Sequence, residues 1–128
     1  MKIDSKEWFK QSEYDFETAI AMLDSGRYIY SVFMCHLSIE KSLKGLYIEY
    51  FKELPPKSHN LIYFLDKLKI ELPEEDNKFI TLLNDQAIAT RYPESLEMLS
   101  SKFSKSSTKL IIKKTKGILE WINSQSKQ

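Results

Sequence analysis

The stretch from Arg27 to Glu53 constrains the fold of this chain more than any other feature. Placed at 100° steps from Tyr28, its apolar side chains fall on two opposite sides of a helix. One side carries Val32, Cys35, Ile39, Leu43, Leu46 and Tyr50, and the other carries Phe33, Leu37, Ile48 and Phe51. A helix that is apolar nearly all round is typical of the buried centre of a larger helical body. The stretch therefore predicts a long central helix surrounded by other helices.

A narrow polar line runs through this apolar stretch. His36, Glu40 and Lys44 follow one another at intervals of four residues, and Lys41 lies beside them. Burying an unpaired charge is costly, so these groups need partners from other helices. The polar line is thus the first place to look for a functional site.

The remaining helices are predicted from apolar periodicity and from capping signals. They cover Asp4 to about Asp24, Asn60 to about Ile70, Pro73 to about Ala89, and Ser104 to Ser124. Residues 94–101 are predicted to form an exposed connection whose Leu96, Met98 and Leu99 touch the body. The inner face of the fourth helix is predicted to be Phe79, Leu82, Leu83, Gln86 and Ala89.

Several short signals mark where the helices start and stop. Asp4 followed by Glu7 has the spacing of a capping box, and Gly26 suits the left-handed position that ends many helices. Pro55 and Pro56 must end the central helix, because proline cannot continue it. Ser58 is predicted to cap the third helix. The fold class is therefore all-α, an up-and-down bundle of four main helices plus a shorter fifth.

Composition limits the class of protein. A length of 128 residues fits a single domain over residues 1–128, and a net charge of +1 neither selects nor excludes nucleic acid. The lone Cys35 allows no intramolecular disulfide, which fits a cytoplasmic location. We expect no membrane span and no export signal, because no apolar run approaches about 18 residues.

Four stretches lie in an order and spacing that resembles the HEPN domain (higher eukaryotes and prokaryotes nucleotide-binding). They are the spacing of Trp8, Asp15, Phe16 and Ala19, the run IEKSLKGL (Ile39–Leu46) preceded by Phe33, the run SHNL (Ser58–Leu61), and the run ATRYP (Ala89–Pro93). The resemblance covers nearly the whole chain and depends on all four stretches together, since none is specific alone. It implies a helical bundle that pairs as a homodimer. It also implies partnership with a small nucleotidyltransferase, in some cases as a toxin–antitoxin module, and binding of a nucleotide or RNA.

Many HEPN proteins are metal-independent ribonucleases whose signature is an arginine followed after four to six residues by a histidine. This chain departs from that signature, because Arg91 is followed by no histidine at that spacing and Arg27 is too far from His36. It instead resembles the subgroup that carries the RYP motif. The arginine–histidine pair that HEPN ribonucleases use is therefore absent from this chain at the expected spacing.

A cluster of polar residues carries two alternative interpretations. Its members are Asp15, Glu40, Lys41, Lys44, Arg91 and Tyr92. In the first interpretation, acids and bases on facing helices pair with one another and fix the register of the bundle. In the second, Arg91 and a lysine hold a phosphate while an aromatic neighbour such as Tyr47 or Tyr92 holds a base. Arginine is rare here, with Arg27 and Arg91 beside seventeen lysines, so each arginine raises the question of bidentate pairing.

His36 and His59 are the histidines that acid–base chemistry could use, with Arg91 as a further catalytic candidate. His59 could equally anchor its loop by hydrogen bonds, and His36 could extend the polar line. The sequence predicts no metal site, because it contains no HExxH motif and no Cys/His cluster. No cofactor is expected.

A run of lysines follows Glu97, from Lys102 to Lys116. Such a run is usually a solvated face, and the alternative is contact with RNA phosphates or with an acidic partner. No aromatic residue lies between Lys105 and Lys116 to stack on bases.

Three hypotheses follow. The first, which we favour, is a non-catalytic HEPN-type domain that binds a nucleotide or a partner, dimerises and works with a nucleotidyltransferase. The second is a divergent ribonuclease that acts on RNA at a dimer cleft through Arg91 and a histidine. The third is a scaffold whose apolar central helix forms an oligomer interface.

Overall fold

The computed structural model describes residues 4–91 and 95–126, without the side chains of residues 88–91. Six helices are found in these ranges and no strand. They are α1 (Ser5–Asp24), α2 (Tyr28–Phe51), α3 (Leu61–Lys67), α4 (Glu74–Arg91), α5 (Leu96–Ser100) and α6 (Lys105–Ser124). The predicted all-α helical bundle is confirmed.

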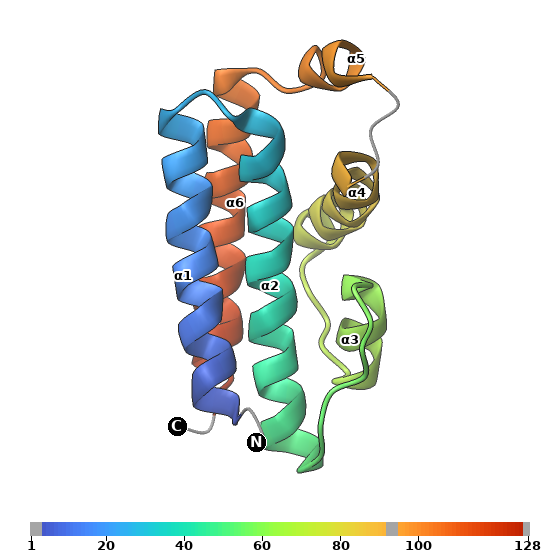
Figure 1. Cartoon of the computed structure of the whole chain (residues 1–128). Helices are drawn as coiled ribbons and strands as arrows, with labels where there is room; N and C mark the ends of the chain where they lie inside the picture. Colours follow the sequence, from blue (N-terminus) through green and yellow to red (C-terminus); the bar gives the residue numbers. More distant parts are fainter. Residues whose placement is uncertain (1–3, 92–94, 127–128) are drawn as a thin grey trace.

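Helix α2 is the centre of the molecule and contacts all five other helices. In Figure 1, α1, α2 and α6 lie side by side along most of their length, while α3 and α4 cover the other side of α2. The stripe predicted to be buried is fully buried except for its last member: Val32, Cys35, Ile39, Leu43 and Leu46 are inaccessible, and Tyr50 is exposed. The central position of α2 explains why its apolar residues extend nearly all round.

The turn between α1 and α2 follows the predicted signal. Gly26 has a φ of +80°, and the amide of Arg27 donates to the carbonyl of Met22 at 2.7 Å. This bond across a left-handed glycine closes the end of α1 and lets α2 return beside it. The two helices are therefore antiparallel neighbours, as Figure 1 shows.

Helix starts differ in detail from the predictions. Asp4 accepts from the amide of Glu7, but the Glu7 carboxylate accepts from Gln11 along the helix, so the predicted capping box is only half formed. Helix α3 is capped by Asn60 instead of Ser58, and the Ser58 hydroxyl accepts from the Asn60 amide.

Two helix lengths also differ from prediction. Helix α3 ends at Lys67, short of Ile70, because Lys69 takes a left-handed φ of 55°. The connection before α6 contains the short helix α5, which starts where Ser95 accepts from the amide of Met98. Of its three apolar residues Leu99 is buried, whereas Leu96 and Met98 are about two-thirds exposed.

The inner face of α4 is rotated from the predicted one. Phe79 and Leu83 are buried as predicted, but Ile80 is buried as well and Leu82 is 55% exposed. Gln86 is half-buried, and the side chain of Ala89 lies outside the described residues. The rotation directs the next turn of α4, which carries Asn84, toward α2 and α3.

Candidate functional site: a buried carboxylate that holds an exposed histidine

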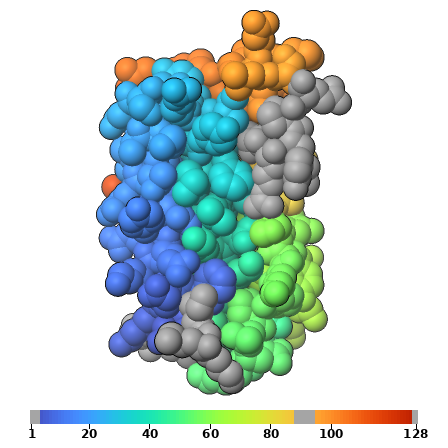
Figure 2. Space-filling model, viewed as in Figure 1, coloured from blue at the N-terminus to red at the C-terminus, as the bar shows by residue number. Residues whose placement is uncertain are grey.

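The site is built on the middle of α2, where Glu40 and Lys44 lie one turn apart on the same side. Pro55 and Pro56 follow the end of α2, and the chain then runs back along α2 before α3 begins (Figure 1). This return brings His59 beside Glu40 across 19 residues of sequence. In Figure 2, α2 is visible between α1 and the segment that follows it, so this part of the central helix borders the surface.

The Glu40 carboxylate is the centre of a charged cluster. Its side chain is only 3% exposed, yet it accepts from the ammonium group of Lys44 at 3.0 Å. The Nδ1 atom of His59 lies 3.1 Å from both carboxylate oxygens, and Nδ1 of His36 lies 3.9 Å from one of them. A buried carboxylate is tolerated when cations and donors surround it in this way.

His59 is the exposed member of this cluster. More than half of its side chain, 57%, is accessible. Because Nδ1 faces a carboxylate, it must carry a proton, and Nε2 is then the nitrogen that can meet a ligand. A carboxylate that holds one ring nitrogen fixes the orientation of the imidazole.

His36 belongs to a second chain of hydrogen bonds, which ties α2 to α3 and α4. Its Nε2 lies 3.1 Å from Oδ1 of Asn84, and the same oxygen accepts from the amide of Leu61. The amide nitrogen of Asn84 donates to Oδ1 of Asn60, which also caps α3. His36 is 1% exposed, so its role in this arrangement is to hold the start of α3 against α2.

Lys44 lies in an aromatic niche as well as beside Glu40. Its Nζ atom is 5.5 Å from the ring centroid of Trp8 and 5.8 Å from that of Phe64. Both distances are within the range of a cation–π contact. The Lys44 side chain is 8% exposed, so its charge is satisfied inside the bundle.

Asp15 and Lys41 form a separate pair between α1 and α2. The Lys41 ammonium lies 2.8 Å from Oδ2 of Asp15, whose side chain is 8% exposed. A serine cluster supports the same interface: the Ser12 hydroxyl donates to the carbonyl of Ser38 at 2.6 Å and lies 2.7 Å from the hydroxyl of Ser42. Small hydrogen-bonded residues allow α1 and α2 to approach closely.

Two predicted ligand contacts cannot be placed. Arg91 is the last residue of α4, but its side chain lies outside the described residues. Tyr92 lies outside them altogether. The structure therefore brings together His36, Glu40, Lys44 and His59, and it places Asp15 with Lys41 in a neighbouring pair.

Sequence reasoning missed Asn84, Asn60 and the serine cluster. Asn84 follows directly after Leu83, which was predicted on the inner face of α4. This position was the one available sign that the Asn84 side chain borders the core. Asn60 follows His59 and precedes an apolar run, which is a cap signal that Ser58 obscured.

Two groups near the core have shifted acidities. Burial raises the pKa of the Cys35 thiol from 9.0 to about 12, and a hydrogen bond with Thr115 opposes the rise. Burial also raises the pKa of Tyr47, and the charge of Glu53 and a hydrogen bond to it act in the same direction. Both groups are therefore neutral at physiological pH.

The arrangement supports recognition or proton transfer at His59. Within the described part of the chain, no group of three or more His, Cys, Asp and Glu side chains could hold a metal ion. Among the helices of the same described residues, none has the length and apolar character needed to cross a membrane.

Comparisons with known proteins agree with this fold. The chain has a TM-score of 0.82 with TT1696 from Thermus thermophilus, at 20% identity over 95% of this chain and 98% of that one. It has a TM-score of 0.76 with ST0689, an archaeal HEPN homologue, at 24% identity over 97% of this chain and 98% of that one. No curated protein matches significantly. The HEPN domain model matches residues 5–125, and the chain therefore belongs to the HEPN domain family.

Proposed function

We propose that this HEPN domain is a binding module that recognises a nucleotide, or a partner that carries one, at the surface around His59. In this proposal the domain is a homodimer that works in the cytoplasm with a small nucleotidyltransferase, in the manner of a toxin–antitoxin module. The observation that carries the proposal is the Glu40–His59 contact, in which a buried carboxylate holds an accessible imidazole.

The contact makes His59 suitable for binding an anion. An imidazole that carries a proton on each nitrogen donates from both of them. With Nδ1 bound to Glu40, Nε2 can donate to a phosphate oxygen. A binding surface built on a fixed ring loses little side-chain freedom when the ligand arrives.

The lysines of the cluster are used differently from His59. Lys44 pairs with Glu40 and Lys41 pairs with Asp15, so both charges are already balanced inside the bundle. We therefore assign phosphate recognition to His59 together with Arg91, and base recognition to Tyr92. Asp15, Glu40, Lys41 and Lys44 keep these contacts in position.

The dimer in this proposal follows from the family. Two large apolar side chains offer surface for it, Leu82 on α4 and Met98 on α5, which are 55% and 67% exposed.

Native mass spectrometry of the chain purified from its own host tests the proposal. We expect a dimer that carries either a nucleotide-sized adduct or a bound protein, which peptide sequencing identifies as a nucleotidyltransferase. His59→Gln should remove most of the adduct or partner, because it removes the imidazole that Glu40 orients and keeps a polar side chain. A bare monomer from the wild-type chain would refute the proposal.

Lys57→Gln is the matched control, because Lys57 is an exposed cation two residues before His59. It should retain the adduct or partner. If Lys57→Gln and His59→Gln lose it equally, general surface charge is responsible, and the specific role of His59 is wrong.

The alternative is a metal-independent ribonuclease, and the same geometry gives it one supporting observation. A carboxylate bound to Nδ1 leaves Nε2 of His59 placed as a general acid or base. In this case wild-type protein cleaves RNA in the presence of EDTA, and His59→Gln and Arg91→Ala each reduce the rate by at least about 100-fold. If purified wild-type protein cleaves no RNA, this alternative is excluded.

A further inference from the structure

A hollow lies at the start of α2, away from the Glu40 cluster. It has a volume of about 340 Å³ and lies between the α1–α2 turn and helix α5. The distance along α2 from Ile29 to Glu40 is about 16 Å, at 1.5 Å per residue. The hollow is therefore separate from the site around His59.

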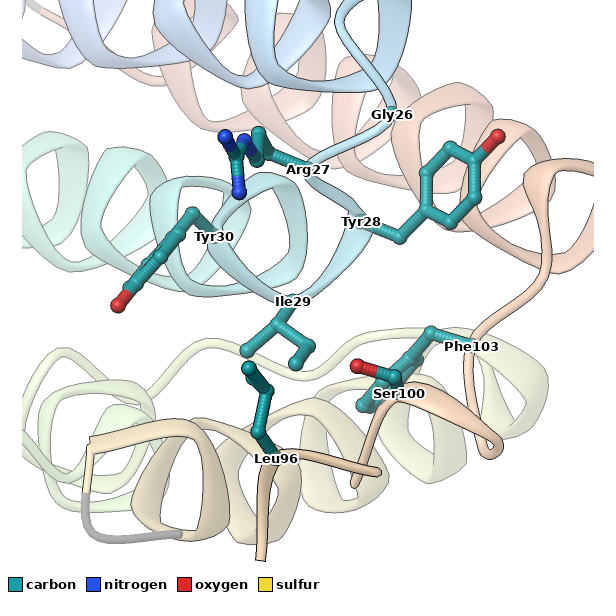
Figure 3. Close-up of a pocket in the computed structure, with 8 residues that line it drawn as sticks. All are labelled: Gly26, Arg27, Tyr28, Ile29, Tyr30, Leu96, Ser100 and Phe103. Atoms are coloured by element: carbon teal, nitrogen blue, oxygen red, sulfur yellow. The ribbon is translucent and has the colours of Figure 1, made fainter. Parts of the chain in front are cut away.

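The walls of the hollow are mainly apolar and aromatic. In Figure 3, Ile29 points toward Leu96, and Phe103 lies on the α5 side of the same space. Ile29 and Phe103 are buried at its base, whereas Tyr30 and Leu96 are 58% and 68% exposed at its rim. A concave apolar space of this volume is within the size range of small-molecule sites.

Arg27 supplies the charge of this hollow. Arg27 is one of the residues that line the hollow, and in Figure 3 its guanidinium group and the ring of Tyr30 both lie to the left of Ile29, away from Phe103 and Ser100. None of the lining residues is acidic, and the ion pairs formed between the described side chains do not include Arg27. The first turn of α2 also contains no acid, so the positive end of the helix adds to the charge of Arg27.

We propose that this hollow binds a small aromatic anion, a flat ring system that carries a carboxylate or phosphate group. The ring enters the apolar space between Ile29 and Leu96, and the anionic group pairs with Arg27. Arginine suits this role because its planar fork pairs with two oxygens and keeps its charge at any physiological pH.

Another hollow of the molecule has the opposite character. It is lined by residues of α3, the α3–α4 connection and α4, and its volume is about 610 Å³. Asp66 and Glu71 contribute to its lining, so it disfavours an anionic ligand. This second hollow provides an internal control within the same protein.

An NMR titration with 1-naphthoate tests the proposal on the full chain. We expect shifts of the backbone amides of Gly26, Tyr28, Ile29 and Ser100, with a dissociation constant on the order of 1 mM. The amides around Asp66 and Glu71 should not respond. The proposal is wrong if 1-naphthoate, at ten times the expected dissociation constant, shifts no amide near Arg27. It is also wrong if 1-naphthoate shifts the amides around both hollows alike.

Two comparisons separate the charge from the apolar contact. Arg27→Gln should weaken the binding of 1-naphthoate by about five-fold. Neutral 1-naphthalenemethanol should bind the wild-type chain and Arg27→Gln with equal affinity. Lys10→Gln is the matched control and should leave the affinity unchanged. Lys10 is an exposed cation on α1, about 21 Å along the helix from Asp24, where α1 ends next to the hollow. Equal affinity of 1-naphthoate for wild type and Arg27→Gln would overturn the assignment.

Leu96→Ala tests the apolar wall without disturbing the core, because Leu96 is exposed. It should weaken the binding of 1-naphthoate and of 1-naphthalenemethanol by the same factor, about three- to five-fold. If the same amides shift with protein concentration before any probe is added, the hollow is a contact between copies of the chain, and the small-molecule proposal is wrong. Ligand binding here is independent of the role proposed for His59, so His59→Gln should leave it unchanged.

Discussion

At the scale of single residues, Glu40 determines how charge is held inside the bundle. One carboxylate faces the buried ammonium of Lys44 and the accessible ring of His59, and each contact depends on the negative charge between them. Removing one partner of a buried ion pair leaves the other charge without compensation, which is far more costly than losing an exposed pair.

Glu40→Gln should therefore lower the free energy of unfolding by about 3–5 kcal/mol, because it leaves Lys44 charged and buried. Urea unfolding measures this change. Glu74→Gln is the matched control, since Glu74 and Lys78 form an exposed pair at the same spacing of four residues. It should have no measurable effect. Equal midpoints for the two variants would contradict the importance of burial.

The thiol of Cys35 predicts how stability changes at high pH. Its pKa is raised from 9.0 to about 12 in the folded chain, so between these values the unfolded thiol loses its proton while the folded one keeps it. The contribution of this thiol to stability is constant below about pH 9 and falls by up to about 1.4 kcal/mol per pH unit between pH 9 and about 12. Cys35→Ala removes this contribution. The stability difference between wild type and Cys35→Ala should hence shrink from pH 9 to 11, and an unchanged difference in urea unfolding would contradict it.

Some residues of the site were predictable from sequence, and others were not. Asp15 and Glu40 interrupt the apolar faces of their helices. A carboxylate that is buried with such a face needs a partner of opposite charge, so both residues could be predicted to form ion pairs. Asn84 gave no comparable signal, because asparagine is usually exposed and its partners His36 and Asn60 are 48 and 24 residues away in sequence. Only the three-dimensional arrangement joins them.

At the scale of elements, long helices were predicted well and short ones poorly. The bounds of α1, α2 and α6 follow from many apolar positions that agree with one another. The ends of α3 and α5 depend on one or two residues, such as the left-handed Lys69 and the cap at Ser95. The rotation of α4, with Ile80 inward and Leu82 outward, is set by packing against α2 and is not encoded in periodicity alone.

Two glycines inside helices provide a matched test of helix contact. A Cβ atom at Gly45 would lie 2.9 Å from ring atoms of Phe9, whereas one at Gly117 would meet nothing within 4 Å. Gly117→Ala should raise the free energy of unfolding by about 0.5–1 kcal/mol, because alanine favours the helix. Gly45→Ala has the same helix gain but displaces Phe9, which costs about 1–3 kcal/mol, so it should be destabilising.

Thermal unfolding of the two glycine variants tests whether the close contact between Gly45 and Phe9 constrains the packing of α1 against α2. If Gly45→Ala raises the melting temperature as much as Gly117→Ala does, then the ring of Phe9 moves freely and the close contact between α1 and α2 is not a constraint. A lower melting temperature for Gly45→Ala alone would show that the small residue is required for the two helices to approach.

At the scale of the whole molecule, α2 connects parts that have little contact with one another. Helices α1 and α6 pack on one side of it and on each other, while α3 and α4 form the second side (Figure 1). Cys35 of α2 lies against Thr115 of α6, and His36 next to it reaches Asn84 of α4. Adjacent residues of one helix thus face opposite halves of the bundle.

Stability should consequently decrease from α2 outward. Amides of α2 between Val32 and Tyr47 are surrounded by packed helices, so we expect them to exchange with solvent only when the whole chain unfolds. Helix α5 buries one side chain, Leu99, so it can open alone. Native-state hydrogen exchange by NMR should give α5 an opening free energy at least about 2 kcal/mol below that of α2, a difference of roughly 30-fold in exchange. Equal opening free energies in α2 and α5 would instead mean that the bundle unfolds as one unit, with the end that carries the hollow beside Arg27 as stable as its centre.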